Sequence, residues 1–214
     1  MQQFTFNEKA ENKYKKESIE WLNIWCEDTN DDSLPRVGLI GDSITTQTHK
    51  IVKEELKGLA NVDYLSTSYS ILSLAYVGII EKFIEDSKYD IIYFNYGLHG
   101  YGVTANEYEN AFRVMIKMFL SHNAKVIIGL TTTVLEKDDL NKESERWTSV
   151  VKERNAIAIS LAKEFNLAID DLYSISKKLG KDGKSPDGVH FNDYGKEIIG
   201  KSKADTIKKL LTII

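Results

Sequence analysis

Short apolar runs alternate with amphipathic segments along most of this chain. Between the runs, apolar residues recur every three or four positions, which is the spacing of a helix with one buried face. The helical pattern covers about 43–58, 72–84, 104–122, 147–165 and 192 to the C-terminus, and the apolar runs lie at 36–41, 62–65, 91–94, 126–130 and 167–169. Short continuous runs separated by helices indicate parallel strands that are buried on both faces. The pattern therefore predicts an α/β fold, a three-layer α/β/α sandwich.

The start of the chain has a helical pattern of its own. Apolar residues there share one helical face and predict a helix over 7–26, packed on the outside of the core. They are Ala10, Tyr14, Trp21, Leu22 and Trp25. The acidic, turn-rich residues 27–35 then indicate a loop into the first strand. With 214 residues and no internal repeat, the whole chain fits one domain, in which residues 1–34 form an N-terminal helix and loop.

Composition argues against several classes of function. The 28 basic and 32 acidic residues are interspersed, with a net charge of -4, so we expect neither nucleic-acid nor membrane partners. The single cysteine, Cys26, excludes an intramolecular disulfide and a cysteine-built zinc site, and its aromatic neighbours predict that it serves in packing. We see no signal peptide and no apolar run of about 18 residues, so the cytoplasm is the expected location. A trimmed leader would leave the same sequence.

Ligands of open parallel sheets bind outside the carboxyl ends of the strands. Four polar segments follow predicted strands there, at 41–46, 66–70, 95–102 and 131–133. We expect these segments to share one rim and to form the functional site.

Ser43 is the first candidate for chemistry at this rim. A serine at the start of a helix lies near free backbone N–H groups and the positive end of the helix dipole, which favours an oxyanion forming beside it. A structural role competes, because Asp42, Ser43 and Thr45 are all good helix N-cap residues. A catalytic role for Ser43 requires a base.

His190 is the best candidate for that base. Of the other histidines, His49 and His122 fit surface or capping positions. His190 lies in an irregular stretch before the last helix, three positions after Asp187. The Asp187 carboxylate can accept from the imidazole Nδ1–H and leave Nε2 free to take a proton from a serine, although Asp187 can also shape a turn. Because His190 must be neutral to act as a base, we expect activity to fall as the pH drops.

Three segments together resemble the SGNH/GDSL hydrolase superfamily of esterases, lipases and carbohydrate acetylesterases. They are Gly41-Asp42-Ser43-Ile44, Asn95-Tyr96-Gly97-Leu98-His99-Gly100 and Asp187-Gly188-Val189-His190. The resemblance spans about residues 36–200 and implies a flavodoxin-like sheet of five parallel strands. It also implies a catalytic triad of Ser43, Asp187 and His190, a small-molecule or carbohydrate ester as substrate, and neither a metal nor an organic cofactor.

The chain departs from this family in the residues that would hold the oxyanion. The family motif that corresponds to residues 95–100 usually reads Gly-x-Asn-Asp, and its asparagine side chain donates to the oxyanion. Here His99 follows Gly97-Leu98 in place of that asparagine. Gly-Leu-His resembles a variant block of a bacterial branch, and His99 can donate through a ring N–H. The family has a further motif whose glycine N–H also donates to the oxyanion. The one glycine between the second and third predicted strands, Gly78, falls inside a helical pattern and does not fit this role. We therefore expect backbone N–H groups near Ser68 or Ser70 to serve with that of Ser43.

Short rim loops without an apolar lid predict a small acyl group, such as acetyl, on a polar alcohol. Asp42, Asn95 and Thr131 are expected to line the site, and four aromatic residues can form a sugar-stacking wall or simply pack. These are Tyr69, Tyr96, Tyr101 and Trp147. Alternatives remain: an O-acyltransferase, a non-catalytic binding protein with a degraded oxyanion hole, or a flavin carrier whose hydroxyl-rich loop 43–48 cradles a phosphate. The oligomeric state is left open.

Overall fold

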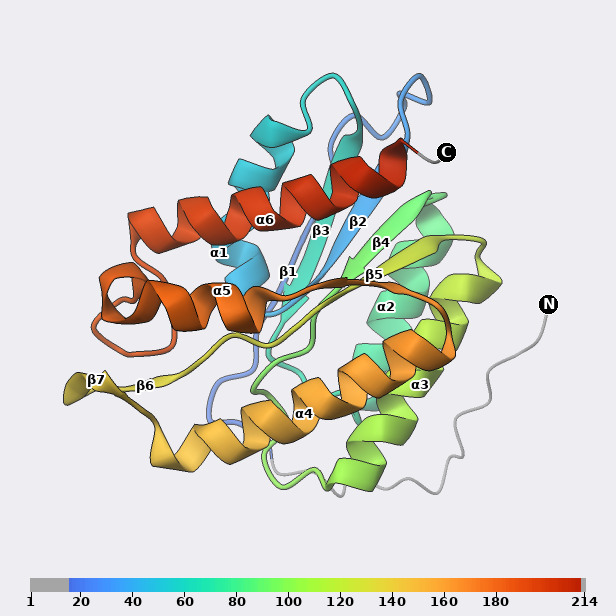
Figure 1. The fold of residues 1–214 in the computed structure, drawn as a ribbon. Coiled ribbons are helices and arrows are strands. Elements are labelled where there is room, and N and C mark those ends of the chain that lie inside the picture. The colour runs from blue at the N-terminus through green and yellow to red at the C-terminus, as the bar shows by residue number, and fades with distance from the viewer. Residues whose placement is uncertain (1–15, 213–214) are drawn as a thin grey trace.

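A six-stranded sheet forms the centre of the computed structural model, which describes residues 16–212 (Figure 1). The strand order is β1-β3-β2-β4-β5-β8, and all neighbours from β3 to β8 are parallel. The strands are β1 Leu22–Trp25, β2 Arg36–Gly41, β3 Asn61–Thr67, β4 Ile91–Phe94, β5 Lys125–Gly129 and β8 Ala168–Asp170. The five predicted parallel strands are therefore confirmed, each to within two residues.

Helices cover both faces of the sheet (Figure 1). On one face lie α1 Ser43–Glu55, α5 Leu172–Leu179 and α6 Asp193–Leu211; on the other lie α2 Leu74–Asp86, α3 Ala105–Ser121 and α4 Glu145–Glu164. Successive strand residues point to opposite faces, so Tyr93 packs in the first of these layers and Phe94 in the second. This is the predicted three-layer α/β/α sandwich. No helix within residues 16–212 is long and apolar enough to cross a membrane.

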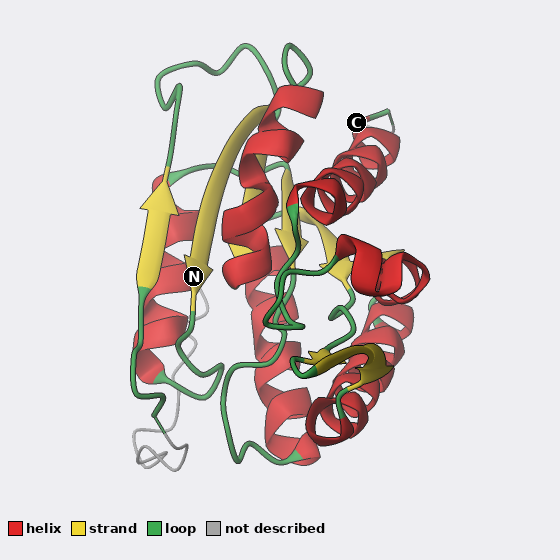
Figure 2. Cartoon of the chain, turned by 90° about the vertical axis from the view of Figure 1, so that its left-hand side faces the viewer, coloured by secondary structure: helices red, strands yellow, loops and turns green. Residues whose placement is uncertain are grey.

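The predicted N-terminal helix is wrong over its described part. Residues 22–25 form the edge strand β1, antiparallel to β3, and Figure 2 shows this strand at the side of the sheet. The pattern misled because its apolar side chains also suit an edge strand, where all four residues of β1 are exposed. Cys26 follows directly and is exposed, so the expected packing role is wrong as well. Residues 7–15 lie outside the described part of the chain.

Two further elements lack an apolar signal in the sequence. A small hairpin, β6 Leu135–Glu136 and β7 Asp139–Glu143, occupies the polar stretch between β5 and α4. The short helix α5 follows β8 and leads through the 3-10 turn η1 Gly180–Gly183 into the segment that carries His190. The hairpin is mostly exposed, and α5 has only eight residues, so neither produces a clear period.

Candidate active site

Ser43 stands at the sharp turn from β2 into α1. Asp42 caps the helix by accepting a hydrogen bond from the Ile44 N–H at 2.9 Å, and Ser43 is the first helical residue. Gly41 is required for this turn, because a Cβ there would lie 2.2 Å from Thr45 Oγ1. The backbone N–H of a first helical residue has no acceptor within its own helix, so the Ser43 N–H lies at the positive end of α1 beside its own hydroxyl.

Ser43, His190 and Asp187 form one hydrogen-bonded chain. His190 Nε2 lies 2.9 Å from Ser43 Oγ, and His190 Nδ1 lies 2.6 Å from Asp187 Oδ2, although 147 positions separate the serine from the histidine. The other carboxylate oxygen, Oδ1, accepts from the backbone N–H groups of Val189 and His190, each at 2.9 Å. Asp187 therefore both shapes the turn and orients the imidazole, so the two roles considered for it are compatible.

The charge of Asp187 is stabilised in place. Partial burial raises the pKa of this carboxyl, but the hydrogen bonds from the His190 ring and from two backbone N–H groups outweigh burial and bring the pKa below its usual value. The carboxylate consequently stays ionised at any pH at which a histidine acts as a base. A charged partner keeps the proton of the neutral imidazole on Nδ1 and leaves the Nε2 lone pair toward Ser43.

The loop that carries Asp187 and His190 is anchored at two points that sequence reasoning missed. Lys184 is buried and donates from Nζ to Thr133 O at 2.6 Å and to Val189 O at 2.8 Å; burial lowers its pKa to about 7. Gly188 has a φ of +73°, and a Cβ there would lie 2.2 Å from Leu135 O in the β6–β7 hairpin. The hairpin and the loop that carries Asp187 and His190 therefore pack backbone against backbone.

A cavity of about 350 Å³ opens beside Ser43 and His190. Most of the residues expected at the rim line it, including Asp42, Asn95, His99, Tyr101 and Thr131. Trp147 also lines it, whereas Tyr96 is buried and Tyr69 is absent from its walls. Gly97, Ser68 and Ser70 are not part of the lining either.

His99 lies at the cavity with one ring nitrogen engaged. Its Nδ1 lies 2.7 Å from Glu17 Oε1, and both side chains are largely buried, at 17% and 16% exposed. The ring of Trp21 contacts the imidazole edge-on. Only Nε2 is therefore left to face a ligand, and Glu17 and Trp21 come from the N-terminal segment that the sequence predicted as an outer helix.

The structure contradicts one of the two positions expected for the second oxyanion donor, Ser68. The Ser68 N–H donates to Trp21 O at 3.2 Å, and Ser68 Oγ accepts from the Trp21 N–H at 2.9 Å. Ser70 is buried, and its hydroxyl accepts from the Leu72 N–H at 3.3 Å. The expectation for Ser68 is therefore wrong, because the N-terminal segment pairs with this loop and uses the N–H group.

Asn95 and Gly97, two other residues expected at the site, make hydrogen bonds that join the loops around the cavity to neighbouring elements. The Asn95 side chain is buried and donates to Gly129 O at 2.8 Å, which ties the ends of β4 and β5 together. Gly97 packs against Asp42, and its carbonyl accepts from the buried Arg154 guanidinium, which also donates to His99 O at 2.8 Å. Asn95 and Gly97, both expected to bind the substrate, therefore help to hold the backbone of the loops around the cavity.

Arg154 and its neighbour Asn155 are functional supports that sequence reasoning missed. The Asn155 side chain exchanges two hydrogen bonds with the backbone of Thr131, at 2.8 and 2.9 Å. A signal was present in the sequence, because both residues fall on the buried stripe of α4, between Val151 and Ala158. Polar side chains on an apolar stripe require partners, and here the partners are the backbone of two rim loops.

The segment 43–48, which the flavin-carrier alternative treats as a phosphate-cradling loop, forms the first part of α1, as the helical pattern predicts. The Thr48 hydroxyl donates to Ile44 O at 2.7 Å, and the hydroxyls of Thr46 and Ser66 lie 2.7 Å apart. These hydroxyl groups are engaged within the protein, so the structure gives no support to the flavin-carrier alternative.

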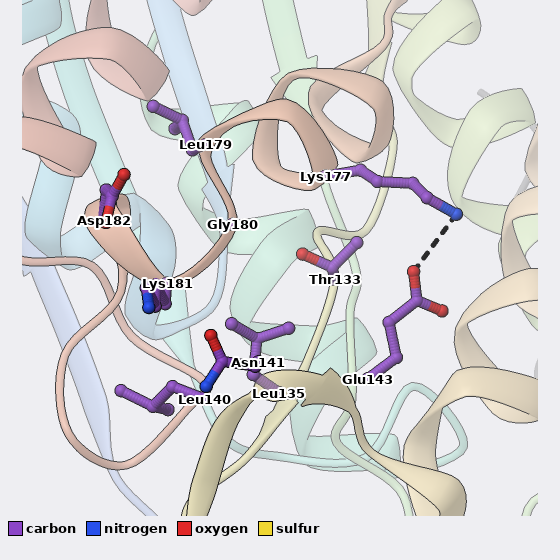
Figure 3. Close-up of a pocket in the computed structure, with 10 residues that line it drawn as sticks. All are labelled: Thr133, Leu135, Leu140, Asn141, Glu143, Lys177, Leu179, Gly180, Lys181 and Asp182. Atoms are coloured by element: carbon purple, nitrogen blue, oxygen red, sulfur yellow. Dashed lines mark ion pairs between the residues drawn. The ribbon is translucent and has the colours of Figure 1, made fainter.

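A separate cavity of about 360 Å³ lies between the β6–β7 hairpin and the end of α5 (Figure 3). Its walls include the ion pair of Lys177 with Glu143, at 3.1 Å, but neither a serine nor a histidine. Within residues 16–212 there is also no cluster of three or more His, Cys, Asp or Glu side chains arranged to hold a metal ion. Ser43 and His190 therefore mark the candidate active site.

Comparison with known structures agrees with this fold. The chain is similar to a lipase/acylhydrolase from Enterococcus faecalis, with a TM-score of 0.66 and 18% identity over 83% of this chain and 97% of that one. It is also similar to the acetyl xylan esterase AlAXEase (TM-score 0.68, 19% identity, 80% and 99% covered) and to a GDSL-like lipase from Bacteroides thetaiotaomicron (0.64, 14%, 82% and 88%). No protein-family model matches the sequence. The chain has the fold of the SGNH/GDSL hydrolases, as its sequence predicts.

Proposed function

We propose that this protein is a serine esterase that cleaves small acyl esters through an acyl-enzyme. The observation that carries the proposal is the hydrogen-bonded chain from Asp187 through His190 to Ser43, at the wall of a cavity. Nucleophile, base and orienting carboxylate are the three roles that serine hydrolysis requires, and each has a residue of the right chemistry within hydrogen-bond distance of the next.

The steps follow from this geometry. His190 Nε2 takes the Ser43 proton as Oγ attacks the ester carbonyl, and the oxyanion forms beside the Ser43 N–H at the start of α1. His190 then gives that proton to the leaving alcohol. Water, deprotonated by the same imidazole, then attacks the acyl carbon, and the imidazolium returns the proton to Ser43 Oγ as the acid leaves. Asp187 remains ionised throughout and stabilises the imidazolium that forms in each half of the reaction.

His99 supplies a further oxyanion donor in this proposal. Its Nδ1–H donates to Glu17, so a neutral ring leaves Nε2 as an acceptor, and a ring with protons on both nitrogens offers Nε2–H to the substrate. A donor next to a developing negative charge is stronger when it is itself charged.

A small acyl group on a polar, sugar-like alcohol suits the cavity. Its volume is modest, and the aromatic residues Tyr101 and Trp147 line its wall, with ring centroids 5.6 Å apart. The acetyl xylan esterase among the structural neighbours has the same fold, which supports acetyl esters of carbohydrates as the substrate class. No observation in the structure favours acyl transfer over hydrolysis.

The test is covalent labelling combined with turnover. We expect a fluorophosphonate probe to label the wild type and p-nitrophenyl acetate to be hydrolysed, and both signals to be lost in Ser43→Ala. Ser160→Ala, which removes an exposed hydroxyl from α4, is the matched control and should behave as wild type. Labelling that persists in Ser43→Ala would overturn the proposal. Product analysis in the presence of an added sugar separates acetate release from acetyl transfer.

A further inference from the structure

One cation faces the active-site cavity without an acidic partner. Arg146, in the first turn of α4, is the one Lys or Arg side chain among the residues that line it. Within residues 16–212, no ion pair joins its guanidinium to a carboxylate, whereas Arg154 on the same helix is buried and donates to three carbonyl groups. An unpaired guanidinium that lines the same cavity as Ser43 is available to a ligand.

Two aromatic rings hold this guanidinium in position. Its carbon lies 4.7 Å from the Trp147 ring centroid and 5.6 Å from that of Tyr101. Contact with a ring face uses the π-surface of the guanidinium and leaves its N–H groups free at the edge. The side chain is therefore held near one place while its donors remain unused, which lowers the entropy lost when a ligand binds.

Arg146 also stands between two cavities. A second one, of about 270 Å³, has Leu98, Tyr101, Arg146 and Trp147 in common with the cavity at Ser43. An alcohol group that extends from an ester bound at Ser43 toward this second cavity passes the guanidinium. Two other charged residues line this second cavity: Glu153, which disfavours an anion, and Arg154, whose guanidinium already donates to three carbonyl groups. The place for a negative charge is therefore at Arg146 itself.

We propose that Arg146 binds a carboxylate on the alcohol part of the ester, so that the substrates are O-acyl esters of acidic, sugar-like alcohols. This inference rests on the esterase activity proposed above and names its substrate class. The planar fork of an arginine matches a carboxylate with two parallel hydrogen bonds, while the rings of Tyr101 and Trp147 keep the guanidinium in place.

The test compares two esters that differ only in charge, O-acetylated galacturonate and O-acetylated galactose. We expect the wild type to favour the acidic ester, and Arg146→Gln to lower kcat/KM for that ester by about 10-fold, mainly through KM. Hydrolysis of the neutral ester should change by less than about 2-fold. Lys152→Gln removes the same charge from an exposed site on the same helix and is the matched control; it should leave the preference intact.

Equal losses for both esters in Arg146→Gln, or a wild type without a preference for the acidic ester, would overturn the inference. Failure of the esterase proposal looks different, because the wild type would then hydrolyse neither ester and would not react with the fluorophosphonate. For that case, binding of free galacturonate and galactose is measured by NMR titration. Weaker galacturonate binding in Arg146→Gln than in Lys152→Gln supports the site, and equal binding in the two variants contradicts it.

Discussion

The two sides of Ser43 are built in different ways. On the base side, His190 and Asp187 belong to one short loop whose backbone is held by Lys184 and by the β6–β7 hairpin. On the donor side, His99 lies on a different loop and is held by Glu17 from the far N-terminal part of the chain. The base side is therefore a local motif on a rigid support, whereas the donor side depends on how a distant segment packs.

The largest effect is expected on the base side. Asp187→Asn should lower kcat by a factor on the order of 10⁴, because the asparagine amide no longer fixes the imidazole tautomer that accepts the Ser43 proton. Steady-state hydrolysis of p-nitrophenyl acetate measures this. Circular dichroism serves as the control for folding. A loss of less than 10-fold would show that His190 does not depend on Asp187.

On the donor side, we expect a smaller loss of kcat, and a second substitution at the same position should restore part of it. His99→Ala should lower kcat by about 100-fold to 1,000-fold, the usual cost of one oxyanion donor. His99→Asn, which restores an amide donor at this position, should recover much of the loss. If the two variants are equally slow, then His99 acts through its contact with Glu17 and not as a donor.

The smallest expected effect is on the stability of the fold, through Lys184, which holds the loop that carries Asp187 and His190. Lys184 has a pKa of about 7 in the folded protein and 10.5 as its usual value, so between these limits the folded state binds fewer protons than the unfolded state. The free energy of unfolding should therefore rise with pH over this range, with a slope of up to about 1.4 kcal/mol per pH unit for one proton. Below pH 7 this residue adds no slope.

Urea unfolding at several pH values between 6.5 and 10 measures this slope in the wild type and in Lys184→Met. The variant should show a shallower rise and not a flat line, because Lys203, buried and with a pKa lowered to about 8, contributes in the same direction. Identical slopes in the two proteins would mean that Lys184 is not buried as the structure shows.

Sequence reasoning succeeded where apolar runs or local motifs carry the information. The run from Ile91 to Phe94 is continuous because both faces of β4 are covered, and its limits were predicted without error. It failed for β1, because Leu22 and Trp25 suit a helix face and an edge strand equally well. It also placed a free donor at Ser68, because no local pattern shows that Trp21 bonds to that residue 47 positions away.

The contact of Ser43 with His190 also affects how the protein folds. A bond across 147 positions closes a very long loop, and the entropy of closing such loops makes contacts of this kind late and slow in folding. During synthesis, Ser43 leaves the ribosome 147 residues before His190. We therefore expect activity to recover during refolding only once the segment before α6 has docked against α1.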